Sequence, residues 1–143
     1  MPRFQSLAFP GWLTTDSWII NLDAGVGRNR PNQRDDTKVV QFYLEALRSS
    51  EWEGTRIVRR DGRCGTVTIE SILAFQRHVN ATYRASLLED GAVDPLWEGG
   101  EPITKTLGWM SHLYVSHFRQ FWPNIRRHNA YQGVGSNLNL FLW

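Results

Sequence analysis

Three stretches of this chain carry apolar side chains at the spacing of an α-helix, and this periodicity constrains the fold more than any other feature. The predicted helices cover residues 35–49, 67–80 and 103–121, the last of which stops before Pro123 because a proline disfavours helical geometry in the residue before it. The sequence therefore predicts an all-α fold, built as a small three-helix bundle. Its core is expected to bury six apolar side chains: Leu44, Leu47, Ile72, Phe75, Leu107 and Met110.

Short polar residues stand where the first two predicted helices begin. Asp35 or Asp36 is expected to cap the first helix. Thr66 or Thr68 is expected to bond the free amides at the start of the second helix. Both expectations rest on the same physical reason, because the first turn of a helix leaves backbone N–H groups that a nearby side-chain oxygen can accept.

Two Asp-Gly dipeptides, at residues 61–62 and 90–91, mark turns that need a residue tolerant of positive φ. The first two predicted helices also share a dipeptide pattern, Val-Gln at 40–41 and Phe-Gln at 75–76. These shared dipeptides and turns form an internal repeat. Each glutamine is expected to tie a connecting loop to its helix through hydrogen bonds with the backbone.

The composition argues against several classes of protein. A chain of 143 residues has the usual size of one domain, and Cys64, its single cysteine, allows neither an internal disulfide nor by itself a structural zinc site. No segment approaches the roughly 18 apolar residues of a membrane span, and residues 1–13 lack the pattern of a signal peptide, so we expect synthesis in the cytoplasm. The net charge of +2 comes from intermixed signs, which does not indicate nucleic-acid binding.

The sequence shows no motif that commits the chain to catalysis. The four histidines, at positions 78, 112, 117 and 128, never have the His-x-x-x-His spacing that places two zinc ligands on one helical face. Cys64 precedes a helix, where its thiol pKa can be lowered, but a small packed residue is the simpler interpretation. We therefore expect a protein that is not an enzyme, with no catalytic residues, no metal and no cofactor.

The residues around the first Asp-Gly turn resemble a repeat of the peptidoglycan-binding-domain-like family. In that family a helix containing Val-Gln is followed by Asp-Gly-x-x-Gly-x-x-Thr, which opens a second helix ending in Phe-Gln, and residues 61–68 and 75–76 have this spacing. One branch of the family has a Val-Gly-x-x-Asn-Arg-Pro lead and an Asp-Gly-x-Val-Asp-Pro segment. Residues 90–95 are similar to the second, and residues 26–31 are similar to the first with one residue fewer between glycine and asparagine. The resemblance covers about residues 25–110.

The resemblance implies a division of the chain into three parts. Residues 25–122 would form the peptidoglycan-binding-like helical domain, preceded by an N-terminal arm at 1–24 and followed by a C-terminal extension at 123–143. Both extensions are aromatic and irregular in pattern. Short apolar alternations at 18–22 and 138–143 predict a short strand in each of them.

The family further implies a non-catalytic module that binds the cell wall in a shallow groove between helices. Arg63 and Trp97 lie on loops that would line the groove, since aromatic rings stack on sugars and arginine pairs with the carboxylates of a peptide stem. Gln76 and Asp94, which belong to the family motifs, complete the expected ligand-binding residues. The expected ligand is the glycan or the stem peptide of peptidoglycan.

A second function stays open because the chain departs from the family pattern. The third-helix motif carries an insertion at residues 96–102 and the predicted helix after it is longer than usual, so the position of the groove is undecided. The same branch looks like proteins found beside type VI secretion and phage-like contractile injection systems, which implies an adaptor that binds a protein of such an apparatus. Wall binding would require delivery to the periplasm by that apparatus or by phage lysis.

Overall fold

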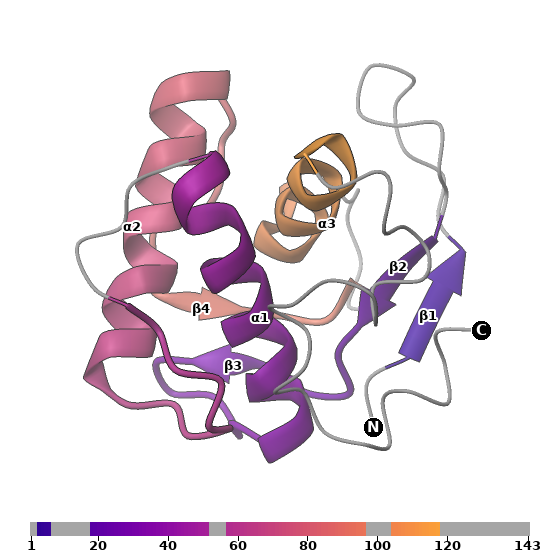
Figure 1. Ribbon diagram of the computed structural model, residues 1–143, viewed down its shortest axis with the longest axis vertical. Coiled ribbons are helices and arrows are strands. Elements are labelled where there is room, and N and C mark those ends of the chain that lie inside the picture. The colour runs from indigo at the N-terminus through magenta and orange to yellow at the C-terminus, as the bar shows by residue number, and fades with distance from the viewer. Residues whose placement is uncertain (1–2, 7–17, 52–56, 97–103, 118–143) are drawn as a thin grey trace.

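The computed structural model describes residues 3–6, 18–51, 57–96 and 104–117, and Figure 1 shows their arrangement. Within these residues the chain is predominantly helical, which confirms the coarse fold class predicted from the sequence. In chain order the elements are β1 (Arg3–Ser6), β2 (Trp18–Asn21), β3 (Val26–Gly27), α1 (Arg34–Ser50), α2 (Thr66–Tyr83), β4 (Ala92–Val93) and α3 (Thr106–His117).

Helix α1 is the central element of the described fold. It contacts both α2 and α3, and Figure 1 shows it lying between them. Strands β1 and β2 form an antiparallel pair whose second strand contacts α3, while β3 and β4 form another antiparallel pair that contacts α2. Segments that are distant in the sequence therefore meet around one helix.

The predicted helices are present with shifted ends. Helix α1 is one residue longer at each end than predicted, and α2 begins one residue earlier and continues for one more turn, to Tyr83. Helix α3 begins at Thr106, and its described part extends to His117. The predicted end of the third helix at residue 121 lies outside the described residues.

The hydrophobic core lies where α1 packs against α2 and α3. The six side chains predicted to be buried are each at most 1% exposed, which confirms that prediction. Three rings join two helices in this core, because Tyr114 of α3 lies 5.2 Å from Phe42 and 5.8 Å from Tyr43 of α1 between ring centroids. The Tyr43 hydroxyl lies 3.3 Å from the Ser111 hydroxyl, so this buried polar group has a partner.

The N-terminal part of the chain contributes to the same core. Leu22 is fully buried and belongs to the main hydrophobic cluster. Asn21 is also fully buried, and its side-chain oxygen accepts a hydrogen bond of 3.0 Å from the backbone N–H of Leu96. The end of β2 is therefore held against the segment that follows β4.

The cap predicted for α1 is wrong. Gln33 precedes the helix and makes no side-chain capping bond, and Asp35 and Asp36 lie within the first helical turn. The buried carboxylate of Asp36 instead accepts backbone N–H bonds from Asp23, at 3.0 Å, and Ala24, at 3.1 Å. Burial raises the pKa of Asp36 to about 6, because a carboxylate is harder to ionise away from water. Asp36 thus fastens the segment before β3 to α1.

The cap predicted for α2 is also wrong. Gly65 precedes this helix, and no side chain caps it. Thr66 is already the first helical residue, and the hydroxyl of Thr68 accepts a 3.2 Å hydrogen bond from the side chain of Gln41. The Thr68 hydroxyl, which the sequence assigned to a cap of its own helix, therefore binds a side chain of another helix.

The predicted strand at residues 18–22 corresponds to β2 and is confirmed. The pairing of β3 with β4 was not predicted, because each strand has only two residues. The backbones approach closely there: Gly27 has φ of +120°, and a Cβ on it would lie 2.2 Å from the carbonyl oxygen of Gly91. The strand predicted at residues 138–143 lies outside the described residues.

Candidate functional site

Gln41 on α1 holds a turn formed by residues 61–63, called here the Asp61 turn. Its side-chain nitrogen lies 3.1 Å from an Asp61 carboxylate oxygen and 2.9 Å from the Arg63 carbonyl, and its side-chain oxygen accepts the Gly62 N–H at 2.9 Å. Asp61 also accepts the Arg63 N–H at 2.9 Å, which closes the turn. Gln41 itself is 1% exposed, whereas Asp61 is exposed, so the turn is held from its buried side.

Gln76 on α2 holds a second turn, residues 90–92, called here the Asp90 turn. The side-chain nitrogen lies 3.1 Å from Asp90 and 3.0 Å from the Ala92 carbonyl, and the side-chain oxygen accepts the Gly91 N–H at 3.0 Å. The same nitrogen lies 3.0 Å from the hydroxyl of Thr106, the first residue of α3. Gln76 is fully buried.

The two turns are built by the same set of contacts. In each, a helical glutamine binds the aspartate, the glycine N–H, the next carbonyl and a threonine near the start of the following helix. Gly62 and Gly91 have φ of +75° and +69°, the positive values predicted for both turns. The predicted role of the two glutamines is therefore confirmed, and it accounts for the internal repeat in the sequence.

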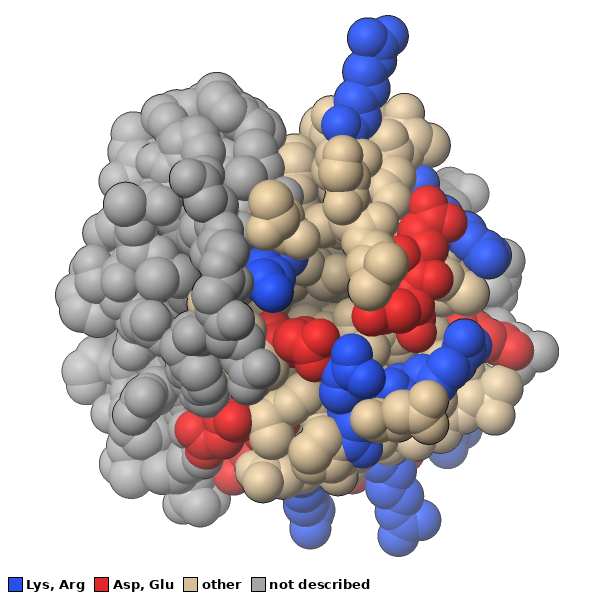
Figure 2. Space-filling view, turned by 180° about the vertical axis from the view of Figure 1, so that it is seen from behind, with Lys and Arg blue, Asp and Glu red and all other residues tan. Residues whose placement is uncertain are grey.

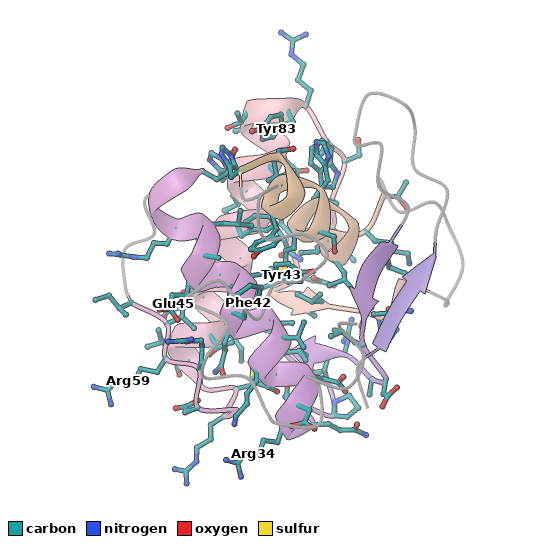
Figure 3. All side chains as sticks on the ribbon, turned by 45° about the vertical axis from the view of Figure 1, so that its right-hand side comes forward. Arg34, Phe42, Tyr43, Glu45, Arg59 and Tyr83 are labelled. Atoms are coloured by element: carbon teal, nitrogen blue, oxygen red, sulfur yellow. The ribbon has the colours of Figure 1, made fainter. Side chains whose placement is uncertain are left out.

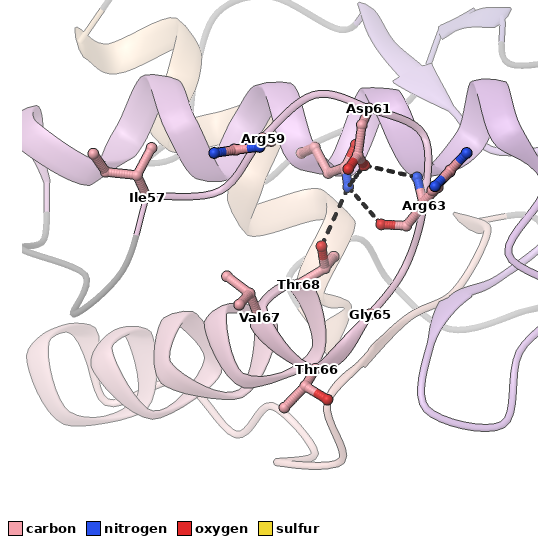
Figure 4. A pocket seen from close by; sticks show the side chains of 9 residues that line it. Ile57, Arg59, Asp61, Arg63, Gly65, Thr66, Val67 and Thr68 are labelled. Atoms are coloured by element: carbon pink, nitrogen blue, oxygen red, sulfur yellow. Dashed lines mark hydrogen bonds between the residues drawn. The ribbon is translucent and has the colours of Figure 1, made fainter.

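A pocket of about 320 Å³ lies between the Asp61 turn and the start of α2 (Figure 4). A second hollow of about 380 Å³ adjoins it, because both are lined by Ile57, Arg59 and Asp61. The lining of the first pocket combines charged, hydroxyl and apolar side chains: Gln41, Ile57, Arg59, Asp61, Arg63, Gly65, Thr66, Val67 and Thr68. These residues come from α1, from the loop before α2 and from the first turn of α2.

The arginines near this pocket differ in their partners. Arg60 forms an ion pair of 2.6 Å with Glu45 of α1. Arg59 and Arg63 are exposed and form no ion pair within the described residues. Figure 3 shows Arg59 pointing away from the helices, on the same side as Arg34. The pocket therefore has two cationic groups that an added anion can reach.

Asp61 supplies the negative charge at the pocket. The hydrogen bond from the Arg63 N–H is the main cause that lowers the pKa of this carboxyl; burial opposes it, and the Gln41 side chain lowers the pKa further. The carboxylate therefore stays ionised at neutral pH while it holds the turn. With two arginines and one aspartate, the lining carries a net charge of +1.

The Asp90 turn is covered where the Asp61 turn is open. Strand β3 pairs with β4 beside it, and Arg28 donates its backbone N–H to the Gly91 carbonyl at 3.1 Å. Arg30 binds both oxygens of Asp94, at 2.6 and 3.1 Å, and lies 3.7 Å from Asp90. The arginine beside this turn is thus paired with carboxylates.

The structure separates the four residues that the sequence assigned to ligand binding. Arg63 lines the pocket, whereas Gln76 and Asp94 lie at the covered Asp90 turn. Trp97 lies outside the described residues. Sequence reasoning missed Arg59 as a pocket residue, although its position two residues before an Asp-Gly turn was a usable signal.

Cys64 lies beside the pocket and is half-buried. Burial raises the pKa of its thiol, and this effect outweighs a hydrogen bond with the Gly27 backbone that lowers it. A raised pKa leaves the thiol protonated near neutral pH, whereas a nucleophilic cysteine needs a thiolate. The environment of Cys64 is that of a packed side chain.

A second polar cluster lies at the far end of α1, centred on Glu51. The Glu51 side chain is 6% exposed and contacts His78 at 3.0 Å, Tyr83 and His117, so it joins the ends of all three helices. Burial opposes ionisation of Glu51, but hydrogen bonds from these three residues outweigh it and lower the pKa of its carboxyl. The cluster is a structural connection, because its donors are already directed at the carboxylate.

The described residues contain neither a metal-binding cluster nor a membrane-spanning helix. No group of three or more His, Cys, Asp or Glu side chains in these ranges is arranged to hold a metal ion. Among the described helices, none has the length and apolar character that a membrane span needs. Figure 2 shows acidic and basic side chains lying side by side on the described part of one face.

Comparison with known proteins adds no assignment: no family model, curated protein or solved structure matches this chain.

Proposed function

We propose that this chain is a non-catalytic peptidoglycan-binding module, with the peptidoglycan-binding-like three-helix arrangement that its motifs resemble. The observation that carries the proposal is the pocket at the Asp61 turn, where Arg59 and Arg63 lie beside apolar side chains at the start of α2. The motif that carries the family resemblance, residues 61–68, supplies most of this lining.

The chemistry of the pocket suits a wall peptide. A peptide stem presents carboxylate groups next to small apolar side chains, and arginine pairs with carboxylate through two parallel hydrogen bonds. Ile57 and Val67 supply apolar surface at the same pocket. The volume of about 320 Å³ falls at the lower end of the range for small-ligand sites, which favours a short segment of peptide over an extended polymer.

The framework of the pocket supports binding without catalysis. Gln41 bonds to both Asp61 and Thr68, and Asp61 bonds to the turn, so their polar atoms position the loop. A rigid frame that presents exposed side chains from a loop is the usual arrangement of a recognition site. Cysteine can act as a nucleophile, but the raised pKa of the Cys64 thiol agrees with a site that binds without catalysis.

Sedimentation with purified peptidoglycan sacculi tests the proposal. We expect the chain to co-sediment, and Arg59→Gln with Arg63→Gln together to weaken binding by about tenfold or more, which corresponds to roughly 1.4 kcal/mol. Arg77→Gln is the matched control, because Arg77 is an exposed arginine further along α2 that pairs with Glu89. Equal binding by the double variant and the control would overturn this site.

The adaptor function is the outcome favoured if the folded chain does not bind sacculi. The pocket would then need a protein ligand, and binding to a purified component of an injection apparatus should depend on the same two arginines. A thermal unfolding curve of each variant is required beside the binding curve, so that loss of binding is not confused with loss of the fold.

A further inference from the structure

We propose that the pocket at the Asp61 turn binds the free C-terminal carboxylate of a short peptide that ends in a small apolar residue, with Arg59 and Arg63 as the two recognising groups. This inference rests on the proposed function and specifies which part of the wall the pocket reads: a peptide terminus rather than the glycan.

Neighbouring arginines near the pocket differ in whether they form an ion pair. Arg60 is neutralised by Glu45 at 2.6 Å, although it follows Arg59 directly in the chain. Arg59 and Arg63 line the pocket and form no ion pair with any described residue. An arginine with unused donors beside a hollow favours a planar anion, because its guanidinium matches the two oxygens of a carboxylate.

The charges at the pocket also limit the ligand. Asp61 is fixed at the pocket by Gln41 and by the Arg63 N–H, and it stays ionised because these bonds lower its pKa. The two arginines therefore have to offset this charge before they balance that of a ligand. The remaining charge of +1 matches one carboxylate and disfavours a dianion such as a phosphate monoester.

The pocket also has apolar surface beside its cations. Ile57 lines the pocket and is 70% exposed, and Val67 lines it from the first turn of α2. An exposed isoleucine next to two arginines gives a methyl group of the ligand a partner while the carboxylate is held. A sugar ring carries hydroxyl groups around its edge. It would therefore fit the unpaired cations and this apolar side chain less well than a carboxylate beside a methyl group.

The direct test uses a defined probe, acetyl-D-alanyl-D-alanine, and its C-terminal amide. We expect the carboxylate form to shift the backbone amide signals of Arg63, Thr66 and Thr68 in a ¹H–¹⁵N spectrum. The amide form should bind more weakly, by a factor of about ten or more. Arg59→Gln and Arg63→Gln should each reduce binding of the carboxylate form, and Arg77→Gln should leave it unchanged. Equal binding of the acid and the amide would overturn the inference.

A second experiment separates this inference from the proposed function. Sacculi whose carboxyl groups have been converted to amides are compared with untreated sacculi in co-sedimentation. Loss of binding on amidation supports carboxylate recognition, whereas equal binding overturns it and leaves wall binding in place. If untreated sacculi are not bound, the proposed function fails, and the acid and amide probes alone then decide whether the pocket reads a carboxylate.

Discussion

The Asp61 turn and the Asp90 turn are built from the same contacts but are covered differently. Each is held by a buried glutamine on the preceding helix and by a glycine of positive φ. Strand β3 and Arg30 cover the Asp90 turn, whereas the Asp61 turn borders an open pocket. The same kind of turn thus occurs twice in the fold. The segments that pack on each turn decide whether a ligand can reach its surroundings.

The two turns also differ in what happens to their charges. Arg30 pairs with Asp94 and approaches Asp90, so the arginine beside the covered turn is already held by carboxylates. Arg59 and Arg63 beside the open turn have no such partner among the described residues. The comparison therefore predicts that changes at the Asp90 turn affect stability, while changes of charge at the Asp61 turn affect binding.

The largest expected effect comes from closing the space between β3 and the Asp90 turn. Gly27→Ala should destabilise the protein by about 3 kcal/mol or more, because the new Cβ would meet the Gly91 carbonyl and φ is +120°. Gly65→Ala, beside the open pocket, should change stability by less than about 0.5 kcal/mol, since nothing lies within 4 Å of its Cβ position. Urea unfolding of both variants measures the difference, and similar losses would contradict the contrast.

Removing the two glutamines tests whether the equivalent contacts carry equal weight. We expect Gln76→Ala to cost about 2–3 kcal/mol, because four partners, three of them buried, lose their bond to the side chain. Gln41→Ala should cost less, about 1–2 kcal/mol, because Asp61 is exposed and water can replace part of what is lost. A larger loss for Gln41→Ala in calorimetry would mean that the open turn is the more important for stability.

The pH dependence of stability tests how the segment before β3 is held to α1. Asp36 holds the backbone of residues 23 and 24, and burial raises its pKa from 3.8 to about 6. Its folded pKa lies above the unfolded value, so its contribution is fully present below about pH 3.8 and is lost as pH rises through about 6.

The size of this effect is about 3 kcal/mol, since the pKa rises from 3.8 to about 6 and each pKa unit corresponds to about 1.4 kcal/mol. Asp36→Asn should remove this part of the slope between pH 4 and pH 7, as measured by denaturant midpoints. The slope is the informative quantity, because asparagine has one acceptor oxygen and can lower stability at every pH. An unchanged slope would show that Asp36 is not the titrating group.

The smallest expected effect concerns the ion pair at the covered turn. Arg30→Gln should cost about 1 kcal/mol or less, because Arg30 and Asp94 are partly exposed and solvent screens their attraction. The cost should shrink in high salt. Arg63→Gln should leave the melting temperature unchanged, and a drop as large as that of Arg30→Gln would indicate that Arg63 has a structural role.

The sequence by itself determined the local features of this protein. The helices follow from apolar side chains repeated at helical spacing, and the two turns follow from dipeptides whose glycine tolerates positive φ. The roles of Gln41 and Gln76 were also predictable, because the same residue type recurs at the same place in two similar patterns. Arg63 could be named as a binding residue because it lies in the loop between the first Asp-Gly turn and the second helix.

Only the tertiary structure decided which partner each polar side chain takes. Asp36 and Thr68 were expected to cap their own helices, but Asp36 binds the chain before β3 and Thr68 binds Gln41 of another helix. The histidine spacing excluded a local pair, yet His78 and His117 meet at Glu51 from different helices. Periodicity reports on neighbours within one helix, whereas these contacts depend on how helices pack, and packing also left one turn covered and the other open.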